Sequence, residues 1–183
     1  DGVKSEIFVI VPTTSLQEVL RSITEDVEEI EILFDETQAR FRLGEVEITS
    51  KLIDGNFPDY RQLIPKKTDI NIELDKSEFM RMAKVAALFA RESGGSVVCE
   101  AKAEENKFFV SAVASELGEN DSYMDTEVSE DGKIVLNSRF LMDALNAINE
   151  TTLDFGFSGK LAPVVIKGKK TKDYTHIVMP LKS

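Results

Sequence analysis

The stretch INIELDKSEF (70–79) joins the pattern of a β-strand directly to the start of an α-helix. Apolar and polar residues alternate over 70–74, which predicts a half-buried strand, because successive side chains of a strand point to opposite faces. Asp75 and Glu78 then have the spacing of a capping box, in which a short oxygen side chain accepts from amides of the first helical turn. The apolar positions that follow with helical spacing are Phe79, Met82, Ala83 and Ala86.

Two other parts of the chain repeat this order of strand, polar cap and amphipathic helix, at 7–23 and 134–148. Their first helical positions, Leu16 and Leu141, lie 63 residues before Phe79 and 62 residues after it. A unit of one helix and several strands that recurs at constant phase predicts a repeated α+β fold. The strand-like stretches after the first two helices are 29–34, 39–43, 45–52, 96–101 and 107–114.

Residues that favour helix ends support these boundaries. Thr14 and Gln17 have capping-box spacing at the start of the first helix. Gly94 and Gly95 lie where the second helix should end, and they match neither a phosphate-binding loop nor a dinucleotide fingerprint. We therefore interpret the glycine pair as a helix stop.

Composition indicates a globular protein that does not coat nucleic acid. The chain has 183 residues, 42% of them hydrophobic, so it can bury the core of one large domain or two smaller ones. The net charge of -11 argues against binding driven by phosphate contacts, so any contact with DNA must be local and weak. No apolar run reaches the ~18 residues that a membrane-spanning helix needs.

Cys99 is the only cysteine, which excludes an internal disulfide and favours a reducing compartment. Its apolar neighbours predict a buried strand residue, with a reactive thiol as the alternative.

A linker is predicted between the first and second units. Pro65, Lys66 and Lys67 have the proline and charge of a short domain connection. If two units make one domain, residues 66–183 form a complete domain and residues 1–65 are an odd unit. The sequence starts at Asp1 without a methionine, so we interpret it as a piece of a longer chain.

Candidate catalytic groups are few. His176, the only histidine, lies in an alternating terminal segment, and no Gly-x-Ser-x-Gly motif accompanies it, which disfavours a serine hydrolase. The many carboxylates lack metal-ligand spacing. We therefore expect no enzyme, no metal site and no cofactor. The alternative is a small-substrate enzyme whose loop carboxylates meet only in three dimensions; metal-dependent activity lost on mutating two of them would favour it.

Two segments are more apolar than ordinary linkers and tails, LIDGNFPDYRQLIP (52–65) and IVMPLKS (177–183). Chain ends are usually polar and frayed. One hypothesis is that both segments line an apolar groove for a partner's hydrophobic side chains, since methionine adapts well to such contacts. The alternative is ordinary packing of a linker and a tail on the domain.

The first of these segments, 52–65, resembles the signature of the bacterial DNA sliding clamp family, the beta subunit of DNA polymerase III, and HIVMPLK (176–182) resembles the C-terminal end of that family. The resemblance extends through VPTTSLQEVL (11–20), LFARE (88–92), LNSRFLMDALNAI (136–148) and LAPVVI (161–166). It implies a DNA-clamp fold, with the second half of the middle domain at 1–65 and the complete C-terminal domain at 66–183. It also implies a cytoplasmic processivity factor that encircles duplex DNA as a homodimer ring.

The resemblance assigns roles to particular residues. Arg81, Lys84 and Arg91 would lie on a helix that faces DNA, in a segment, 76–91, of local charge +3. Ala87, Leu88 and Phe89 would lie at the ring interface. A groove would take short linear motifs from polymerase, clamp loader and repair proteins. Its residues would be Pro58, Gln62, Leu63, Asn137, Phe140, Leu161, Pro163, Ile177, Met179, Pro180 and Leu181.

The chain departs from the family pattern, because an N-terminal domain and the first half of the middle domain have no counterpart in it. We therefore expect that this chain cannot close a ring by itself, and that its affinity for peptides is impaired. A clamp-like interaction module that encircles nothing is the alternative function.

Overall fold

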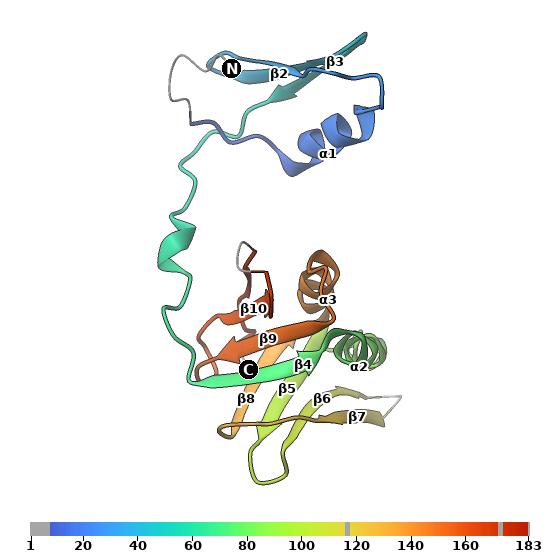
Figure 1. Cartoon of the computed structure of the whole chain (residues 1–183), viewed down its shortest axis with the longest axis vertical. Helices are drawn as coiled ribbons and strands as arrows, with labels where there is room; N and C mark the ends of the chain where they lie inside the picture. The colour runs from blue at the N-terminus through green and yellow to red at the C-terminus, as the bar shows by residue number, and fades with distance from the viewer. Residues whose placement is uncertain (1–7, 116–117, 172–173, 183) are drawn as a thin grey trace. The chain divides into compact units, whose positions relative to one another are not determined.

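The computed structural model describes residues 8–115, 118–171 and 174–182, and the chain divides into two compact units (Figure 1). The first unit ends at Asp59 and the second begins at Tyr60. This division lies earlier than the boundary expected after Pro65, because the short 3-10 helix Tyr60–Gln62 groups with the second unit.

From residue 8 onward, the first unit has one helix, α1 (Thr13–Ser22), and one antiparallel sheet. The strands follow the order β1 (Glu31–Phe34), β2 (Gln38–Leu43) and β3 (Val46–Lys51). Alternation along β2 buries Ala39, Phe41 and Leu43, which pack with Val19 of α1. These four buried residues are a small core for an independent unit.

Over its described residues, the second unit has two α-helices, α2 (Lys76–Phe89) and α3 (Ser138–Ala147), and two four-stranded antiparallel sheets. The sheet orders are β11-β10-β9-β4 and β7-β6-β5-β8. The strands are β4 (Ile70–Asp75), β5 (Ser96–Lys102), β6 (Lys107–Ala114), β7 (Gly118–Asp125), β8 (Gly132–Asn137), β9 (Thr152–Phe157), β10 (Val164–Gly168) and β11 (His176–Val178).

The two repeats of the second unit exchange their first strands. β4 of one repeat pairs with β9 of the other, which sets Ile72 opposite Phe155. β8 pairs in the same way with β5, which sets Ile134 opposite Cys99. The helices α2 and α3 also pack against each other. Each repeat therefore completes the sheet and covers the helix of the other.

Aromatic side chains from both repeats meet in the core of the second unit. Phe79 of α2 packs edge-on against Phe108 and Phe155, with ring centroids 5.4 and 5.5 Å apart. All three side chains are fully buried. Edge-to-face pairs of this kind add about 0.5–1.5 kcal/mol to the stabilisation by burial.

One carbonyl in the segment before the helix of each repeat accepts a hydrogen bond from the segment that follows the last strand of that repeat. The Ile10 carbonyl accepts from the Ile53 amide at 2.8 Å, and the Val135 carbonyl accepts from the Leu181 amide at 2.8 Å. The Glu73 carbonyl accepts from the Thr126 hydroxyl at 2.7 Å. Ile10, Glu73 and Val135 occupy equivalent positions under the spacings of 63 and 62 residues. The repeat thus extends to individual hydrogen bonds.

The predicted α+β class is confirmed, and so is the helix-strand order from α1 onward. The strand expected before α1 does not form over residues 8–11, where the backbone has no sheet partner within the described residues. The cap at Asp75 is also confirmed, since its carboxylate accepts from the Glu78 amide at 2.8 Å. The cap at Thr14 is wrong: α1 starts at Thr13, so Thr14 lies inside the first turn, and the Pro12 carbonyl accepts from the Ser15 and Leu16 amides. The stop after α2 is confirmed, because Gly94 and Gly95 adopt φ of 67° and 82°, in the left-handed region that favours glycine.

Candidate functional site

The C-terminal segment is fixed on both sides of Met179. On one side, Val178 of β11 pairs with Val164 of β10. On the other, the Leu181 amide donates to the Val135 carbonyl of β8. Met179 lies between these two attachments with 54% of its surface exposed. The segment therefore presents an apolar side chain from an anchored backbone instead of a frayed end.

Two further exposed apolar side chains, Leu161 and Phe140, come from neighbouring elements. Val164 pairs with Val178, so the residue before Val164, Pro163, lies beside the residue after Val178, Met179. Leu161, two residues before Pro163, is 66% exposed. Phe140, in the first turn of α3, is 57% exposed, and α3 contacts β11.

Asn137 fixes the start of α3 at this surface. Its Oδ1 accepts from the Arg139 amide at 3.0 Å, and its Nδ2 donates to the Gly94 carbonyl at 3.2 Å. A single side chain thus caps α3 and ties it to the turn after α2. Through these two bonds, Asn137 positions the helix that carries Phe140.

We use the name C-terminal patch for the predicted groove residues that these elements carry. They are Asn137, Phe140, Leu161, Pro163, Ile177, Met179, Pro180 and Leu181. Ile177, Pro180 and Leu181 are half-buried, so they support the exposed members. The predicted participation of Pro58, Gln62 and Leu63 stays a prediction; Pro58 belongs to the first unit, and Leu63 is 49% exposed in the second.

The backbone contact between Leu181 and Val135 was missed by sequence reasoning. Neither side chain takes part in it, so no residue type signals it. The repeat phase relates it to a second bond of the same kind, because Val135 matches Ile10, whose carbonyl accepts from the Ile53 amide.

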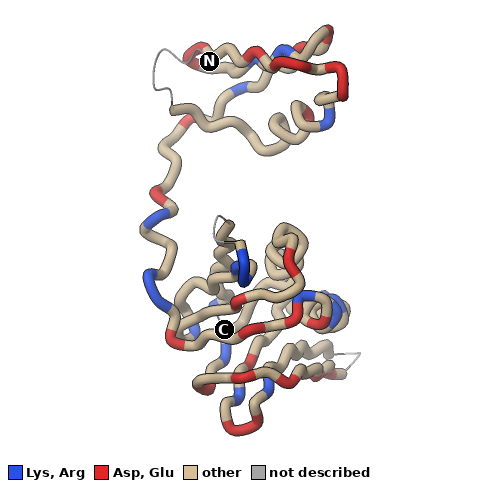
Figure 2. The backbone as a smooth tube through the Cα atoms, in the orientation of Figure 1, with Lys and Arg blue, Asp and Glu red and all other residues tan. Residues whose placement is uncertain are grey.

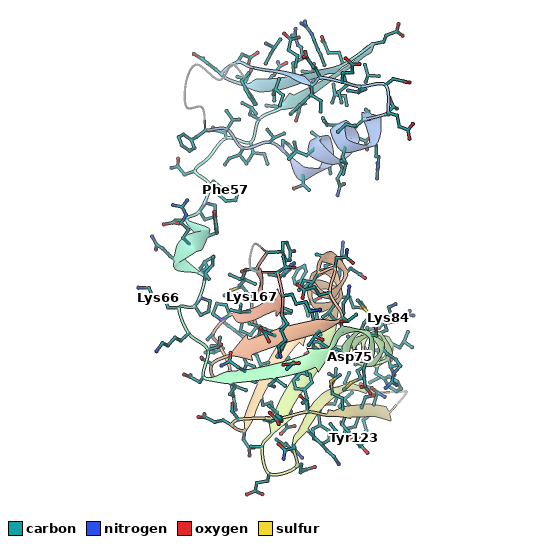
Figure 3. The ribbon with its side chains drawn as sticks, in the orientation of Figure 1. Phe57, Lys66, Asp75, Lys84, Tyr123 and Lys167 are labelled. Carbon is teal, nitrogen blue, oxygen red and sulfur yellow. The ribbon has the colours of Figure 1, made fainter. Side chains whose placement is uncertain are left out.

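Basic residues occur along α2 (Figure 2), and Lys84 extends from this helix (Figure 3). Arg81 and Lys84 are both exposed, and Arg81 forms an ion pair with Glu78 at 3.3 Å. The prediction that Arg91 lies on this helix is wrong, because α2 ends at Phe89 and Ala90 is its C-cap. Arg91 instead lies in the turn that begins at Ala90 and that the glycine pair completes.

The predicted ring-interface residues form the last turn of α2. Leu88 is 52% exposed, whereas Ala87 and Phe89 are half-buried. Phe89 also packs against the core of the second unit. An exposed leucine beside two anchored residues can contact another surface, but its role stays a prediction.

The two side chains considered as reactive groups, Cys99 and His176, have environments that the structure defines. Cys99 is buried as predicted, and burial raises the pKa of its thiol to about 12, which leaves almost no thiolate at neutral pH. The His176 Nδ1 lies 2.8 Å from the Tyr174 hydroxyl. Burial lowers the pKa of His176, while Asp143 acts in the opposite direction. Within the described residues, no three metal-binding side chains cluster, and no helix is long and apolar enough to cross a membrane.

Comparison with known protein families identifies the family of this chain. Residues 61–182 match the family described as DNA polymerase III beta subunit, C-terminal domain, and residues 2–59 match the one described as its central domain. The chain belongs to the DNA polymerase III beta subunit family. Its second unit therefore carries the C-terminal domain of a beta subunit, and its first unit carries part of the central domain.

Relatives in this family are named beta sliding clamps. The chain is 30% identical to the one from Staphylococcus aureus and 29% identical to the one from Staphylococcus epidermidis, over 177 residues in each case. These alignments cover 96% of this chain but 47% of each relative. The chain thus spans about half the length of the beta subunits that it matches.

Solved beta subunits have the same fold. The beta chain from Streptococcus pneumoniae superposes with a TM-score of 0.86 at 27% identity, covering 98% of this chain and 48% of that one. The sliding clamp from Bacillus subtilis gives 0.83 at 26% identity, covering 96% and 47%. The clamp from Bartonella birtlesii, solved bound to griselimycin, gives 0.85 at 25% identity, with the same coverage.

Proposed function

We propose that this chain carries the partner-binding part of a DNA sliding clamp, a processivity factor that tethers polymerase by encircling duplex DNA. Membership in the beta subunit family supports this function. The observation that carries the proposal is the anchored C-terminal patch, in which Phe140, Leu161 and Met179 expose more than half of their surfaces. Exposed apolar side chains on a rigid support suit recognition of a hydrophobic peptide.

The chemistry of the patch favours weak, exchangeable partners. Each leucine or phenylalanine that a partner buries here would contribute about 1.5–3 kcal/mol, before the cost of ordering the peptide. Two such anchors give an affinity that lets polymerase, clamp loader and repair proteins replace one another. The griselimycin-bound clamp from Bartonella birtlesii supports ligand binding by clamps of this fold.

Tethering by topology needs little attraction to DNA, which suits a chain of net charge -11. Arg81 and Lys84 of α2 would give diffuse phosphate contacts without reading bases. The exposed Leu88, with Ala87 and Phe89, would meet another subunit in a homodimeric ring of full-length chains. Such a protein makes and breaks no covalent bond, so we propose that it is not an enzyme and that it acts in the cytoplasm.

Peptide binding tests this function directly. We expect a fluorescein-labelled peptide of the Gln-Leu-x-Leu-Phe type to bind saturably to the chain, measured by fluorescence polarisation. Ending the chain at Val178 removes Met179 and the Leu181 contact, so binding should be lost. Met179→Glu should have the same effect while leaving that backbone contact in place.

Val113→Glu is the matched control, because Val113 is also apolar and is 64% exposed on β6, outside the patch. Unchanged binding to the Met179→Glu variant would reject the patch as the peptide site. A second experiment measures how long full-length clamps that carry Met179→Glu stay on circular duplex DNA. Retention on DNA supports a clamp that encircles it, whereas no retention supports a module that encircles nothing.

A further inference from the structure

The charged residues within the segments that form the C-terminal patch are basic, although the chain is acidic overall. These segments, 137–142, 158–163 and 177–182, contain three basic residues and no acidic one. In the whole chain, acidic residues outnumber basic ones by 33 to 22. The three basic residues are Arg139, Lys160 and Lys182, and all three are exposed. We call them the basic rim of the patch.

Each rim residue is the sequence neighbour of an apolar residue of the patch. The neighbours are Arg139 with Phe140, Lys160 with Leu161, and Lys182 with Leu181. The first pair opens α3, the second lies in the turn between β9 and β10, and the third follows β11. Phe140 and Leu161 expose more than half of their surfaces. A peptide that covers these two side chains would therefore have its flanking residues near cations.

The basic rim has no counterion in the part of the chain that the structure describes. None of its three side chains forms an ion pair with any residue in 8–115, 118–171 or 174–182. Asp143 lies one turn after Arg139 in α3 without pairing with it, and its charge acts on His176. Cations that no carboxylate of the same chain binds are available to the carboxylates of a partner.

Arg139 occupies a position where a cation weakens its helix. The amides at a helix N-terminus carry partial positive charge, so acidic residues are favourable in the first turn and basic ones are unfavourable. The first turn of α3 has Arg139 and no acidic residue, whereas that of α2 has Glu78. α2 also begins with a cation, Lys76, but its ammonium donates to the Ile148 carbonyl. Among the described residues the Arg139 side chain has no such contact, so its charge is better explained by binding than by the fold.

We propose that the basic rim selects motif peptides whose apolar residues are flanked by acidic ones. This inference rests on the proposed function of the C-terminal patch as a peptide site. The patch binds the leucine and phenylalanine of the motif, and the rim pairs with aspartate or glutamate beside them. At about 0.1 M salt the Debye length is about 10 Å, so the nearby rim acts on the peptide while distant acidic residues are largely screened. An acidic chain can thus prefer acidic partners.

Three labelled peptides with the same Gln-Leu-x-Leu-Phe core test this preference by fluorescence polarisation. Their cores are flanked on each side by aspartates, by serines or by lysines. At about 0.1 M sodium chloride, we expect the aspartate-flanked peptide to bind roughly tenfold more tightly than the lysine-flanked one, and the difference should shrink at about 0.5 M. Equal affinities of all three peptides overturn the preference but leave the peptide site standing. If none of them binds, both the preference and the peptide site are wrong.

Charge reversal of the rim identifies the residues responsible. Arg139→Glu with Lys160→Glu should reverse the order of the aspartate-flanked and lysine-flanked peptides, because it places carboxylates beside the patch. Lys102→Glu with Lys107→Glu is the matched control, since it makes the same change of net charge on the β5–β6 hairpin. The control should keep the original order. The same reversal in both variants would assign the preference to net charge and overturn the role of the rim.

Single substitutions of Arg139 separate binding from folding. Arg139→Glu should weaken the preference for aspartate flanks and yet raise the melting temperature, because an acidic residue suits the first turn of a helix. Arg139→Lys keeps the charge and should keep the preference. If Arg139→Glu lowered the melting temperature together with the preference, a structural role would explain the loss and the proposal would be wrong.

Discussion

At the scale of single residues, His176 links the stability of the C-terminal patch to pH near neutrality. It is the only histidine, lies in β11 two residues before Val178, and contacts Tyr174. Burial lowers its pKa in the folded chain, although Asp143 partly counteracts this. The folded state therefore binds a proton less readily than the unfolded state. Stability should be unaffected above the unfolded pKa of about 6.5 and should fall as pH drops from there towards the folded pKa.

Urea unfolding at several pH values between about 7.5 and 5.5 measures this effect. The midpoint should decrease slightly across this window for the native sequence, because the imidazole is only half-buried. His176→Gln should remove that decrease, since carboxylates titrate at lower pH. An identical decrease in both proteins would contradict the assignment to His176.

Asp75 should stabilise α2 through its cap. Asp75→Ala removes the acceptor of the Glu78 amide, so we expect the free energy of unfolding of the second unit to fall by about 1 kcal/mol, within a range of about 0.5–2. Thr14→Ala is the control for α1, because the Thr14 side chain makes no cap there. Chemical denaturation of both variants checks the contrast; equal losses would contradict it.

These two residues also show how far local patterns reach. The cap at Asp75 was predicted because its acceptor and the donating amide are three residues apart. The Thr14 spacing is the same, but the helix is capped at Pro12, two residues earlier than expected, where the backbone is still extended with ψ of 134°. The exact start of a helix depends on the backbone before it, which the side-chain pattern does not record.

At the scale of elements, the exposed cations of α2 should provide much of the chain's weak attraction to DNA. Reversing both charges, Arg81→Glu with Lys84→Glu, should lower the affinity and reduce the slope of log K against log salt by about 2, roughly one for each phosphate contact. Fluorescence anisotropy with a labelled duplex at low salt gives both quantities.

A matched control carries the same charge change on the β5–β6 hairpin. Lys102→Glu with Lys107→Glu reverses two exposed or half-exposed lysines that lie on no helix. If this control weakened DNA binding as much as the α2 variant, net charge and not α2 would account for the attraction.

The elements that make the patch could be predicted only in part. LNSRF predicted the start of α3, and the terminal alternation predicted β11, since both patterns are local. The return of Leu181 to Val135 joins residues far apart in the chain. Single-sequence periodicity carries no information about such partners. Arg91 was placed on the wrong element because its spacing fits a helix that the glycine pair ends earlier.

At the scale of the whole molecule, the two units should unfold as separate cooperative blocks. The first unit has a core of four buried apolar residues, whereas the second has one continuous core that both repeats share. Phe41→Ala should therefore destabilise only the first unit, and Phe155→Ala only the second, each by about 3–5 kcal/mol. Amide hydrogen exchange resolved by peptide measures the two units independently. Faster exchange throughout the second unit of the Phe41→Ala variant would contradict two blocks.

The most direct test of the proposed function follows the methyl signals of the chain by NMR during titration with the labelled motif peptide. We predict that chemical-shift changes concentrate on Leu161, Ile177, Met179 and Leu181, because these methyl groups belong to the C-terminal patch. Methyls of β6, such as Val113, should stay unchanged as the internal reference. Saturating changes confined to another surface would contradict the account.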